Sequence, residues 1–229
     1  MEVKMTYTYL NRPYFNVANA LHNTMEEQDI QYAIVGGSGV QATIVDAVAM
    51  HGLNTIKEHK AELQNLLRPT KDIDIATLKG SNEKMFSVGK EIAEACGAGY
   101  NPMLDSRALK FEFAGQEPVY VQYELSKEDF KGLPEIYDSV VNEAKTLSLC
   151  YNGKHAIDLK VAKPEHLIAS KLTRGADKDK IDISHLLTVC KNSNIPIQLE
   201  DIRAILKGSN KGDLFKNLER ICLDLGISK

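Results

Sequence analysis

An apolar run that stops at two glycines constrains the fold of this chain more than any other feature. Residues 32–35 (YAIV) have the composition of a buried strand, Gly36 and Gly37 interrupt it, and residues 38–50 have the spacing of a helix. Glycine permits backbone angles closed to other residues, and its missing Cβ lets a phosphate approach the N–H groups at a helix start, where the dipole favours negative charge. The pattern predicts an α/β fold with a phosphate site at Gly36, Gly37 and Ser38. An ordinary strand-to-helix turn capped by Ser38 is the alternative.

Two other nucleotide motifs fit this segment poorly. Gly37, Gly39 and Ala42 spell G-x-G-x-x-A, the dinucleotide fingerprint, which requires an acidic residue about 20 positions later at the end of a second strand. At that distance the sequence is helical, so Glu58 and Glu62 lie on the wrong kind of element. A P-loop is excluded because no lysine occurs between residues 32 and 56.

The second informative segment is KDIDIATL, residues 71–78. Side chains alternate along a strand, so Asp72 and Asp74 share one face while the isoleucines between them face the other way. Magnesium is typically held by one or two carboxylates plus substrate phosphates. Arg68 and Thr70 fall on the same face if the extended conformation reaches back past Pro69. A half-exposed strand with an ordinary polar face is the alternative.

Three segments together resemble the nucleotidyltransferase superfamily of DNA polymerase beta-like folds. They are residues 32–41 (YAIVGGSGVQ), 68–76 (RPTKDIDIA) and 161–187 (VAKPEHLIASKLTRGADKDKIDISHLL). The third makes the chain similar to the AbiEii-type branch, known from toxins of toxin–antitoxin and abortive-infection systems. The resemblance spans roughly residues 28–190. It implies a mixed sheet flanked by helices and transfer of a nucleoside monophosphate from an NTP to a hydroxyl of a tRNA end or a protein. It also implies Mg²⁺ or Mn²⁺ as cofactor and a neighbouring antitoxin as a partner.

The resemblance also assigns roles to residues of this sequence. Asp72 and Asp74 match the metal-binding pair, and Asp182, like Glu124, is a candidate to accept the proton of the attacking hydroxyl. Asp179 and Asp182, three apart, share a helix face. The nucleotide-binding candidates are Gly36, Gly37, Ser38, Arg68, Thr70, Lys171, Arg174 and Lys178. Their cations would neutralise the charge of the triphosphate.

The chain departs from the family pattern in two places. Residues 50–67 lengthen the gap between the glycines and Asp72 and predict an inserted helix. The third metal-binding carboxylate is ambiguous. Glu124, on the second strand of a hairpin over residues 107–125, is the favoured candidate, and Glu112 is another. Gln122 occupies a further possible position, which would weaken metal binding.

Composition narrows the remaining function classes. The net charge of −3 argues against broad nonspecific binding of nucleic acids. The four cysteines lack C-x-x-C spacing, which argues against a zinc site and favours free thiols in a reducing cytosol. No run of 18 apolar residues and no signal peptide are present, so we expect a soluble, cytoplasmic protein without a membrane partner. Two rival functions stay open: a nucleotidyltransferase fold that binds a nucleotide or a protein without turnover, and a nicotinamide-dependent oxidoreductase.

Periodicity predicts the order of the elements and two regions. An α/β core over residues 1–163 is expected to precede a helical region over 164–229 that packs on the core and contributes to the site. Expected helices are 14–28, 38–50, 82–96, 164–173, 179–191, 199–207 and 212–225. Expected strands are 31–35, 72–77, the 107–125 hairpin, and a pair at 146–151 and 155–161.

Overall fold

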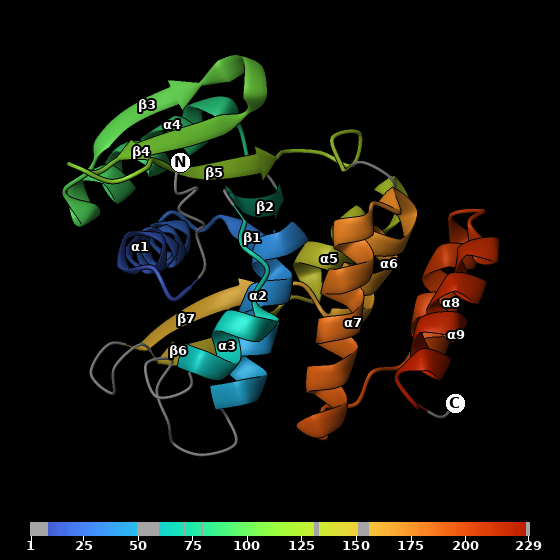
Figure 1. The fold of residues 1–229 in the computed structure, drawn as a ribbon. Helices are drawn as coiled ribbons and strands as arrows, with labels where there is room; N and C mark the ends of the chain where they lie inside the picture. The colour runs from blue at the N-terminus through green and yellow to red at the C-terminus, as the bar shows by residue number, and fades with distance from the viewer. Residues whose placement is uncertain are drawn as a thin grey trace.

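A single mixed β-sheet organises the structure (Figure 1). The computed structural model describes residues 9–49, 60–70, 72–78, 80–130, 133–150 and 156–227. Within these residues, seven strands form the sheet in the order β3-β4-β5-β2-β1-β7-β6. The strands are β1 Gln31–Val35, β2 Asp72–Leu78, β3 Gly99–Met103, β4 Ala108–Glu112, β5 Val119–Glu124, β6 Lys145–Cys150 and β7 Ala156–Val161. The predicted α/β class, a mixed sheet flanked by helices, is confirmed.

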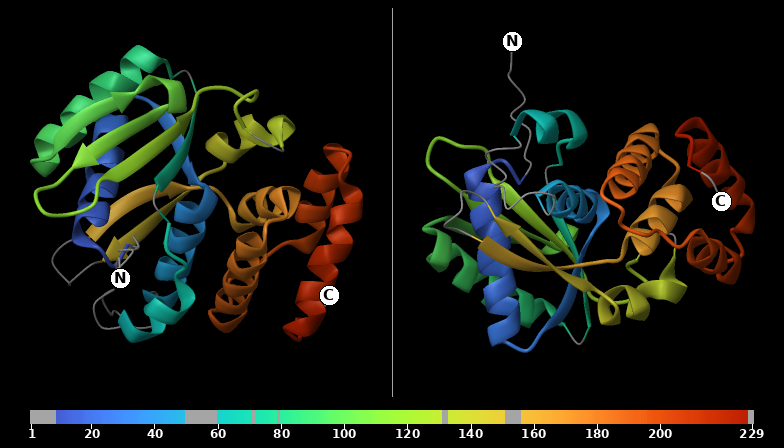
Figure 2. Two further views of the ribbon diagram at one scale, coloured as in Figure 1. Left: turned by 45° about the horizontal axis from the view of Figure 1, so that its top comes forward. Right: turned by 90° about the horizontal axis from the view of Figure 1, so that it is seen from below.

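The helices of the described residues are α1 Arg12–Glu27, α2 Gly36–Ala49, α3 Lys60–Leu66, α4 Asn82–Cys96, α5 Tyr137–Asn142, α6 Pro164–Arg174, α7 Asp177–Asn192, α8 Leu199–Gly208 and α9 Phe215–Asp224. Helices α1 and α4 pack against each other, and α2 packs against β1, β2, β6 and β7 as well as α6 and α7. Figures 1 and 2 show α8 and α9 as the outermost elements of the C-terminal helices. None of the described helices has the length and apolar character needed to cross a membrane.

Local sequence signals account for several helix ends. The side chain of Asn11 accepts a hydrogen bond from the N–H of Tyr14 at the start of α1. Ser81 caps α4 in the same way, and α4 ends where Gly97 adopts a left-handed conformation with φ 62°. These caps are why the predicted bounds of α4 agree with the observed ones.

The centre of the sheet brings the two informative segments together. Strand β1 runs antiparallel to β2, with Val35 opposite Asp74. Strand β5 runs parallel to β2 on its other side, with Gln122 opposite Asp74. The end of β1, and therefore the start of α2, lies directly beside the aspartates of β2.

Strand β3 and helix α5 were not predicted from the sequence, and part of one predicted helix lies outside the described residues. Strand β3 has the sequence GYNPM and is mostly exposed, so it shows no alternation; it exists because it pairs with β4 at the sheet edge, where proline is tolerated. Helix α5 spans only six residues, too few for a clear helical period. The predicted pair β6 and β7 is confirmed. Of the predicted inserted helix, residues 60–66 form α3, and residues 50–59 lie outside the described residues.

The predicted boundary near residue 163 falls between β7 and α6. Helices α6 and α7 contact α2. The division into two regions itself stays a prediction.

Candidate functional site

The site is built around the close approach of Gly36 to Asp74. Gly36 has φ 61°, and a Cβ added to it would lie 2.1 Å from Oδ2 of Asp74. The backbone N–H of Gly37 donates a hydrogen bond to the Asp74 carboxylate. A residue with a Cβ at position 36 would therefore need both a strained left-handed backbone and a shift of this carboxylate.

Ser38 fixes that arrangement from inside the protein. Its hydroxyl is fully buried, donates to the carbonyl of Val35 at 2.9 Å and accepts the N–H of Asp74 at 3.0 Å. The side chain thus joins the ends of β1 and β2. The sequence suggested Ser38 as a phosphate contact, but in the structure its hydroxyl positions Asp74.

Asp72 and Asp74 lie on one face of β2, as the alternation predicts, and both are partly buried. Burial first, and then the charge of Asp72, raise the pKa of Asp74 to about 6, although Lys171, Arg174 and the N–H of Gly37 act to lower it. Tyr14 donates from its hydroxyl to the backbone carbonyl of Asp72 at 3.2 Å. The two carboxylates thus lie in a partly desolvated place at the centre of the sheet. Keeping both of them ionised there costs free energy unless a cation is nearby.

A chain of ion pairs around two buried carboxylates, those of Asp179 and Asp182, adjoins Asp72 and Asp74 and ties them to α6 and α7. Arg68 donates to both carboxylate oxygens of Asp182, at 2.8 and 2.9 Å. Lys171, only 3% exposed, donates to the same Asp182 and lies 3.4 Å from Asp179. Arg174 makes a bidentate contact to Asp179, with Nε at 2.7 Å. Three cations share two carboxylates, which leaves one formal positive charge in excess.

The network lies next to the glycine turn. A Cβ on Gly37 would lie 3.1 Å from a guanidinium nitrogen of Arg68 and 3.4 Å from the Thr70 hydroxyl. The Thr70 hydroxyl also contacts the carbonyl of Asp72 at 3.3 Å. Gln41, on α2, donates to the carbonyl of Arg68 at 2.7 Å. Segments 36–38, 68–70 and 171–182 therefore meet in one place.

The network bears on the role predicted for Asp182. Burial raises its pKa, but hydrogen bonds and charge from Arg68 and Lys171 outweigh burial, so the pKa lies below the usual value. A carboxylate engaged by two cations is a poor proton acceptor. Asp182 holds Arg68 and Lys171 in place, which disfavours it as the acceptor of the proton from the attacking hydroxyl. Its catalytic role stays a prediction. Nothing in the sequence joined it to Arg68, 114 positions earlier.

The remaining cations differ in accessibility. The Arg174 side chain is 51% exposed although it pairs with Asp179. Lys178 is exposed on α7 and makes no ion pair with any described residue. Arg174 lies near enough to Asp74 to lower its pKa.

The register of the strands distinguishes the candidates for a third metal-binding carboxylate. Glu112 is on β4, exposed, and pairs with Lys110 at 2.5 Å. Gln122 is the residue of β5 beside Asp74, and Glu124 lies one step farther along, beside Ala76. Among the described residues, no three His, Cys, Asp or Glu side chains come close enough together to hold a metal ion. The donor set that the structure offers is the pair Asp72 and Asp74, which fits Mg²⁺ only with further oxygens from a bound phosphate.

A cavity of about 400 Å³ opens beside Asp74 on the β5 side. Its polar lining includes Gln122, Glu124 and the ion pair of Arg107 with Asp129. Two further carboxylates, of Asp105 and Glu128, border it. Asp74 therefore lies between the glycine turn on one side and an acidic cavity on the other.

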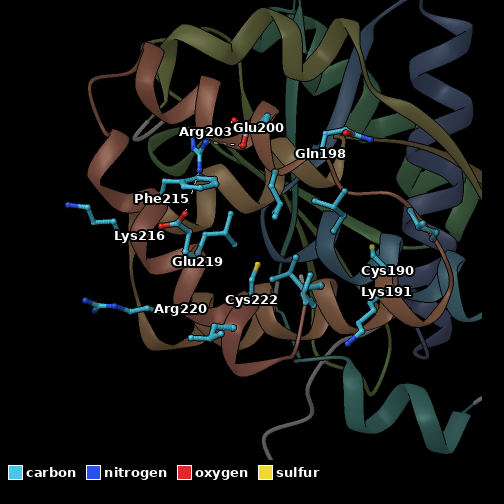
Figure 3. A pocket seen from close by; sticks show the side chains of 17 residues that line it. Cys190, Lys191, Gln198, Glu200, Arg203, Phe215, Lys216, Glu219, Arg220 and Cys222 are labelled. Carbon is cyan, nitrogen blue, oxygen red and sulfur yellow. Dashed lines mark hydrogen bonds and ion pairs between the residues drawn. The ribbon is translucent and has the colours of Figure 1, made fainter. Parts of the chain in front are cut away.

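A separate cavity of about 980 Å³ lies among the C-terminal helices (Figure 3). Its wall is mainly apolar. Figure 3 shows Arg203 over the ring of Phe215. The guanidinium carbon of Arg203 lies 4.4 Å from the ring centre. Cys190 and Cys222 also border it. None of the residues of the ion-pair network lines this cavity, so it is not part of the candidate site.

Comparisons with known proteins give structural similarity without sequence similarity. No protein-family model matches the chain, and no curated protein matches it significantly. The fold is similar to that of the antibiotic-resistance factor ANT(2'')-Ia, at 12% identity over 89% of this chain and 94% of that chain, with a TM-score of 0.45.

Two other solved structures are similar at lower TM-scores. One is a tRNA nucleotidyltransferase in complex with a primer tRNA and an incoming ATP analogue, with 12% identity, 90% of this chain and 60% of that chain covered, and a TM-score of 0.29. The other is a tRNA-processing enzyme in an apo form, with 12% identity, 97% of this chain and 59% of that chain covered, and a TM-score of 0.32. All three TM-scores lie below 0.5.

Proposed function

We propose that the chain is a magnesium-dependent nucleotidyltransferase that moves a nucleoside monophosphate from an NTP to an acceptor hydroxyl. The observation that carries this proposal is the seating of the Gly36 turn directly against the Asp74 carboxylate, with Arg68 beside Gly37. The N–H groups at the helix start and the nearby cations attract a triphosphate. They adjoin two carboxylates, which attract the metal ion that accompanies it. An ordinary strand-to-helix turn does not require this juxtaposition.

Asp72 and Asp74 would hold the metal ion, Mg²⁺ or Mn²⁺, together with phosphate oxygens of the nucleotide. The bound ion would stabilise negative charge on the attacking and leaving oxygens. The glycine turn orients the triphosphate, and Arg68, Lys171 and Arg174 neutralise its charge. Lys171 acts from a buried position fixed by Asp182. Lys178 contributes only a distant, solvent-screened charge.

The acceptor hydroxyl would approach from the acidic cavity beside Asp74. Its oxygen forms a bond to the α-phosphorus, the bond between the α-phosphorus and the bridging oxygen breaks, and pyrophosphate leaves. The proton of the hydroxyl passes to a carboxylate, for which Glu124 is the candidate on the cavity wall. The carboxylates around this cavity disfavour an acceptor with adjacent phosphates. A protein hydroxyl is therefore favoured over a tRNA 3′ end.

A toxin role neutralised by an antitoxin is the finer form of this proposal. Its support is the match of Lys171, Arg174, Asp179 and Asp182 to the AbiEii-type pattern and their convergence in one ion-pair network. Induced expression of the wild-type chain would then arrest growth, and the Asp72→Asn/Asp74→Asn variant would not. Equal arrest by both would exclude a toxicity that depends on this site.

The transfer itself is tested with NTPs labelled on the α-phosphate or on the γ-phosphate. The full chain is incubated with Mg²⁺, each NTP, and either total tRNA or a protein extract as acceptor. Label from the α-phosphate should enter the acceptor while label from the γ-phosphate is released as pyrophosphate. Transfer of γ-label would indicate a kinase instead. The double variant Asp213→Asn/Asp224→Asn, at exposed C-terminal positions, is the matched control and should keep full activity.

A nucleotide-binding protein without turnover is the second candidate. One observation favours it: Gln122, and not a carboxylate, lies beside Asp74. In that case NTP and metal would bind with the same dependence on Asp72 and Asp74, and no labelled acceptor would form with either acceptor pool.

A further inference from the structure

We propose that the metal site of this chain is open on the side of Gln122, so that it binds a divalent ion at least tenfold more tightly together with a nucleotide than alone. This inference rests on the proposed function and deepens it. The central relationship is the pairing of Asp74 with Gln122 across two parallel strands. Gln122 occupies the place from which a third carboxylate would close the site.

The geometry of the strands puts Gln122 within reach of the aspartates. Residues paired across parallel strands point to the same side of a sheet, and neighbouring strands lie about 4.8 Å apart. Gln122 is exposed while Val121 and Tyr123 are buried, which gives it the same face as Asp74. Both residues also border the same cavity. The Gln122 side chain therefore lies beside Asp74 on the same face of the sheet.

Glu124 does not take the place of the missing carboxylate. It is paired with Ala76, about 7 Å farther along the strand. Its backbone carbonyl accepts hydrogen bonds from the hydroxyls of Thr77, at 3.1 Å, and Tyr137, at 2.9 Å. A two-residue slip that brought Glu124 beside Asp74 would break both contacts and the register of β5.

The ligands present also limit metal binding in the absence of nucleotide. Beside Gln122, the site offers the two carboxylates of Asp72 and Asp74. A neutral amide is a weaker ligand for Mg²⁺ than a carboxylate, and Mg²⁺ completes its six ligands with water or phosphate when few carboxylates are present. A bound triphosphate supplies both negative charge and oxygen ligands. By thermodynamic linkage the metal and the nucleotide must then raise each other's affinity equally.

The test measures Mn²⁺ binding to the full chain through the electron paramagnetic resonance signal of free Mn²⁺. Titrations are run with and without an NTP analogue whose α–β bridge is a methylene group, so that turnover cannot occur. The wild-type chain should take up Mn²⁺ at least tenfold more tightly with the analogue than without it. Equal affinity in both titrations would overturn the inference while leaving the proposed function intact.

A gain-of-function variant supplies the second arm. Gln122→Glu replaces one nitrogen by oxygen in a side chain of the same shape, and it should bind Mn²⁺ without nucleotide at least tenfold more tightly than the wild type. Gln116→Glu adds the same charge in the exposed turn between β4 and β5 and should leave Mn²⁺ binding unchanged. Equal Mn²⁺ affinities for the two variants would contradict the role given to Gln122.

The same experiment separates the inference from the proposed function. Calorimetry with the analogue and Mg²⁺ reports nucleotide binding independently of Mn²⁺. A chain that binds no nucleotide under any condition would defeat both. If Gln122→Glu does not fold, which far-ultraviolet circular dichroism reveals, the wild-type comparison alone decides between the outcomes given above.

Discussion

Arg68 and Asp182, 114 positions apart in the chain, form a bidentate ion pair with N–O distances of 2.8 and 2.9 Å. Asp182 is 3% exposed and also accepts from Lys171. This pair fastens the segment before β2 to helix α7. The charge of the site and the packing of the C-terminal helices on the core thus depend on the same side chain.

Removing the Asp182 carboxylate should be strongly destabilising. Asp182→Asn leaves the buried Lys171 and half-buried Arg68 without their shared counter-charge, for which we expect a loss of about 2–4 kcal/mol in the free energy of unfolding at pH 7. The measurement is urea unfolding followed by circular dichroism. Asp177→Asn, which removes an exposed partner of Lys180, should cost less than about 0.5 kcal/mol. Similar losses for both variants would show that the network does not stabilise the fold.

The cost of Asp182→Asn should also depend on pH. The pKa of Asp182 is lowered in the folded chain, because Arg68 and Lys171 outweigh the effect of burial. A carboxyl group with a lowered folded-state pKa stabilises the fold above its unfolded pKa, and that contribution is lost as the pH falls through the folded-state value. The difference between wild type and variant should therefore shrink from pH 7 toward pH 3. A constant difference over this range would contradict the assignment.

Gly36→Ala should disrupt the site more than a comparable change elsewhere. Gly97 has nearly the same φ, 62° against 61°, but a Cβ there would meet nothing within 4 Å. Gly97→Ala should cost about 1 kcal/mol, from left-handed strain alone. Gly36→Ala adds a collision with the Asp74 carboxylate, so we expect a further loss of about 1–3 kcal/mol. Affinity for Mg-NTP should fall at least tenfold for Gly36→Ala and stay unchanged for Gly97→Ala, both measured by calorimetry.

Asp74→Asn should stabilise the metal-free chain at alkaline pH. The pKa of Asp74 is raised to about 6 by burial and by the charge of Asp72, so ionisation of this carboxyl opposes folding above that pH. In EDTA at pH 8 the variant should gain on the order of 1 kcal/mol in unfolding free energy, a figure reduced from the full pKa effect because the group is partly solvated. The gain should disappear near pH 4. Destabilisation of equal size at both pH values would contradict a raised pKa of Asp74 in the folded chain.

Arg174 and Lys178 should differ in their contribution to nucleotide affinity. Arg174 acts on Asp74 and is anchored by Asp179, whereas Lys178 is solvated on α7. Arg174→Ala should weaken Mg-NTP binding about 5- to 30-fold, in keeping with loss of one charge-assisted contact of about 1–2 kcal/mol. Lys178→Ala should change it less than twofold. A larger loss of affinity for Lys178→Ala would indicate that the triphosphate binds away from the ion-pair network.

The sequence predicted the parts of the fold that depend on local pattern. The alternation in KDIDIATL placed Asp72 and Asp74 on one face, and the caps of α4 gave its ends, because both signals lie within a few residues. Strand β3 was missed because GYNPM is a strand only through its pairing with β4.

The features of the site that the sequence did not predict are long-range. Ser38 turned inward to hold Asp74, and Asp182 turned toward Arg68, because tertiary packing brought those partners within reach. The choice between Gln122 and Glu124 required the register of β5 against β2, which a single sequence leaves open by two residues.

The most direct test of the central claim is calorimetric titration of the full chain with each NTP, in Mg²⁺ and in EDTA, beside Asp72→Asn/Asp74→Asn. We predict that the wild-type chain binds at least one NTP in Mg²⁺, loses most of that affinity in EDTA, and loses it equally in the double variant. Binding that the double variant retains in full, or no binding of any NTP to the folded wild-type chain, would contradict the assignment of a nucleotide and metal site to the Gly36 turn and Asp74.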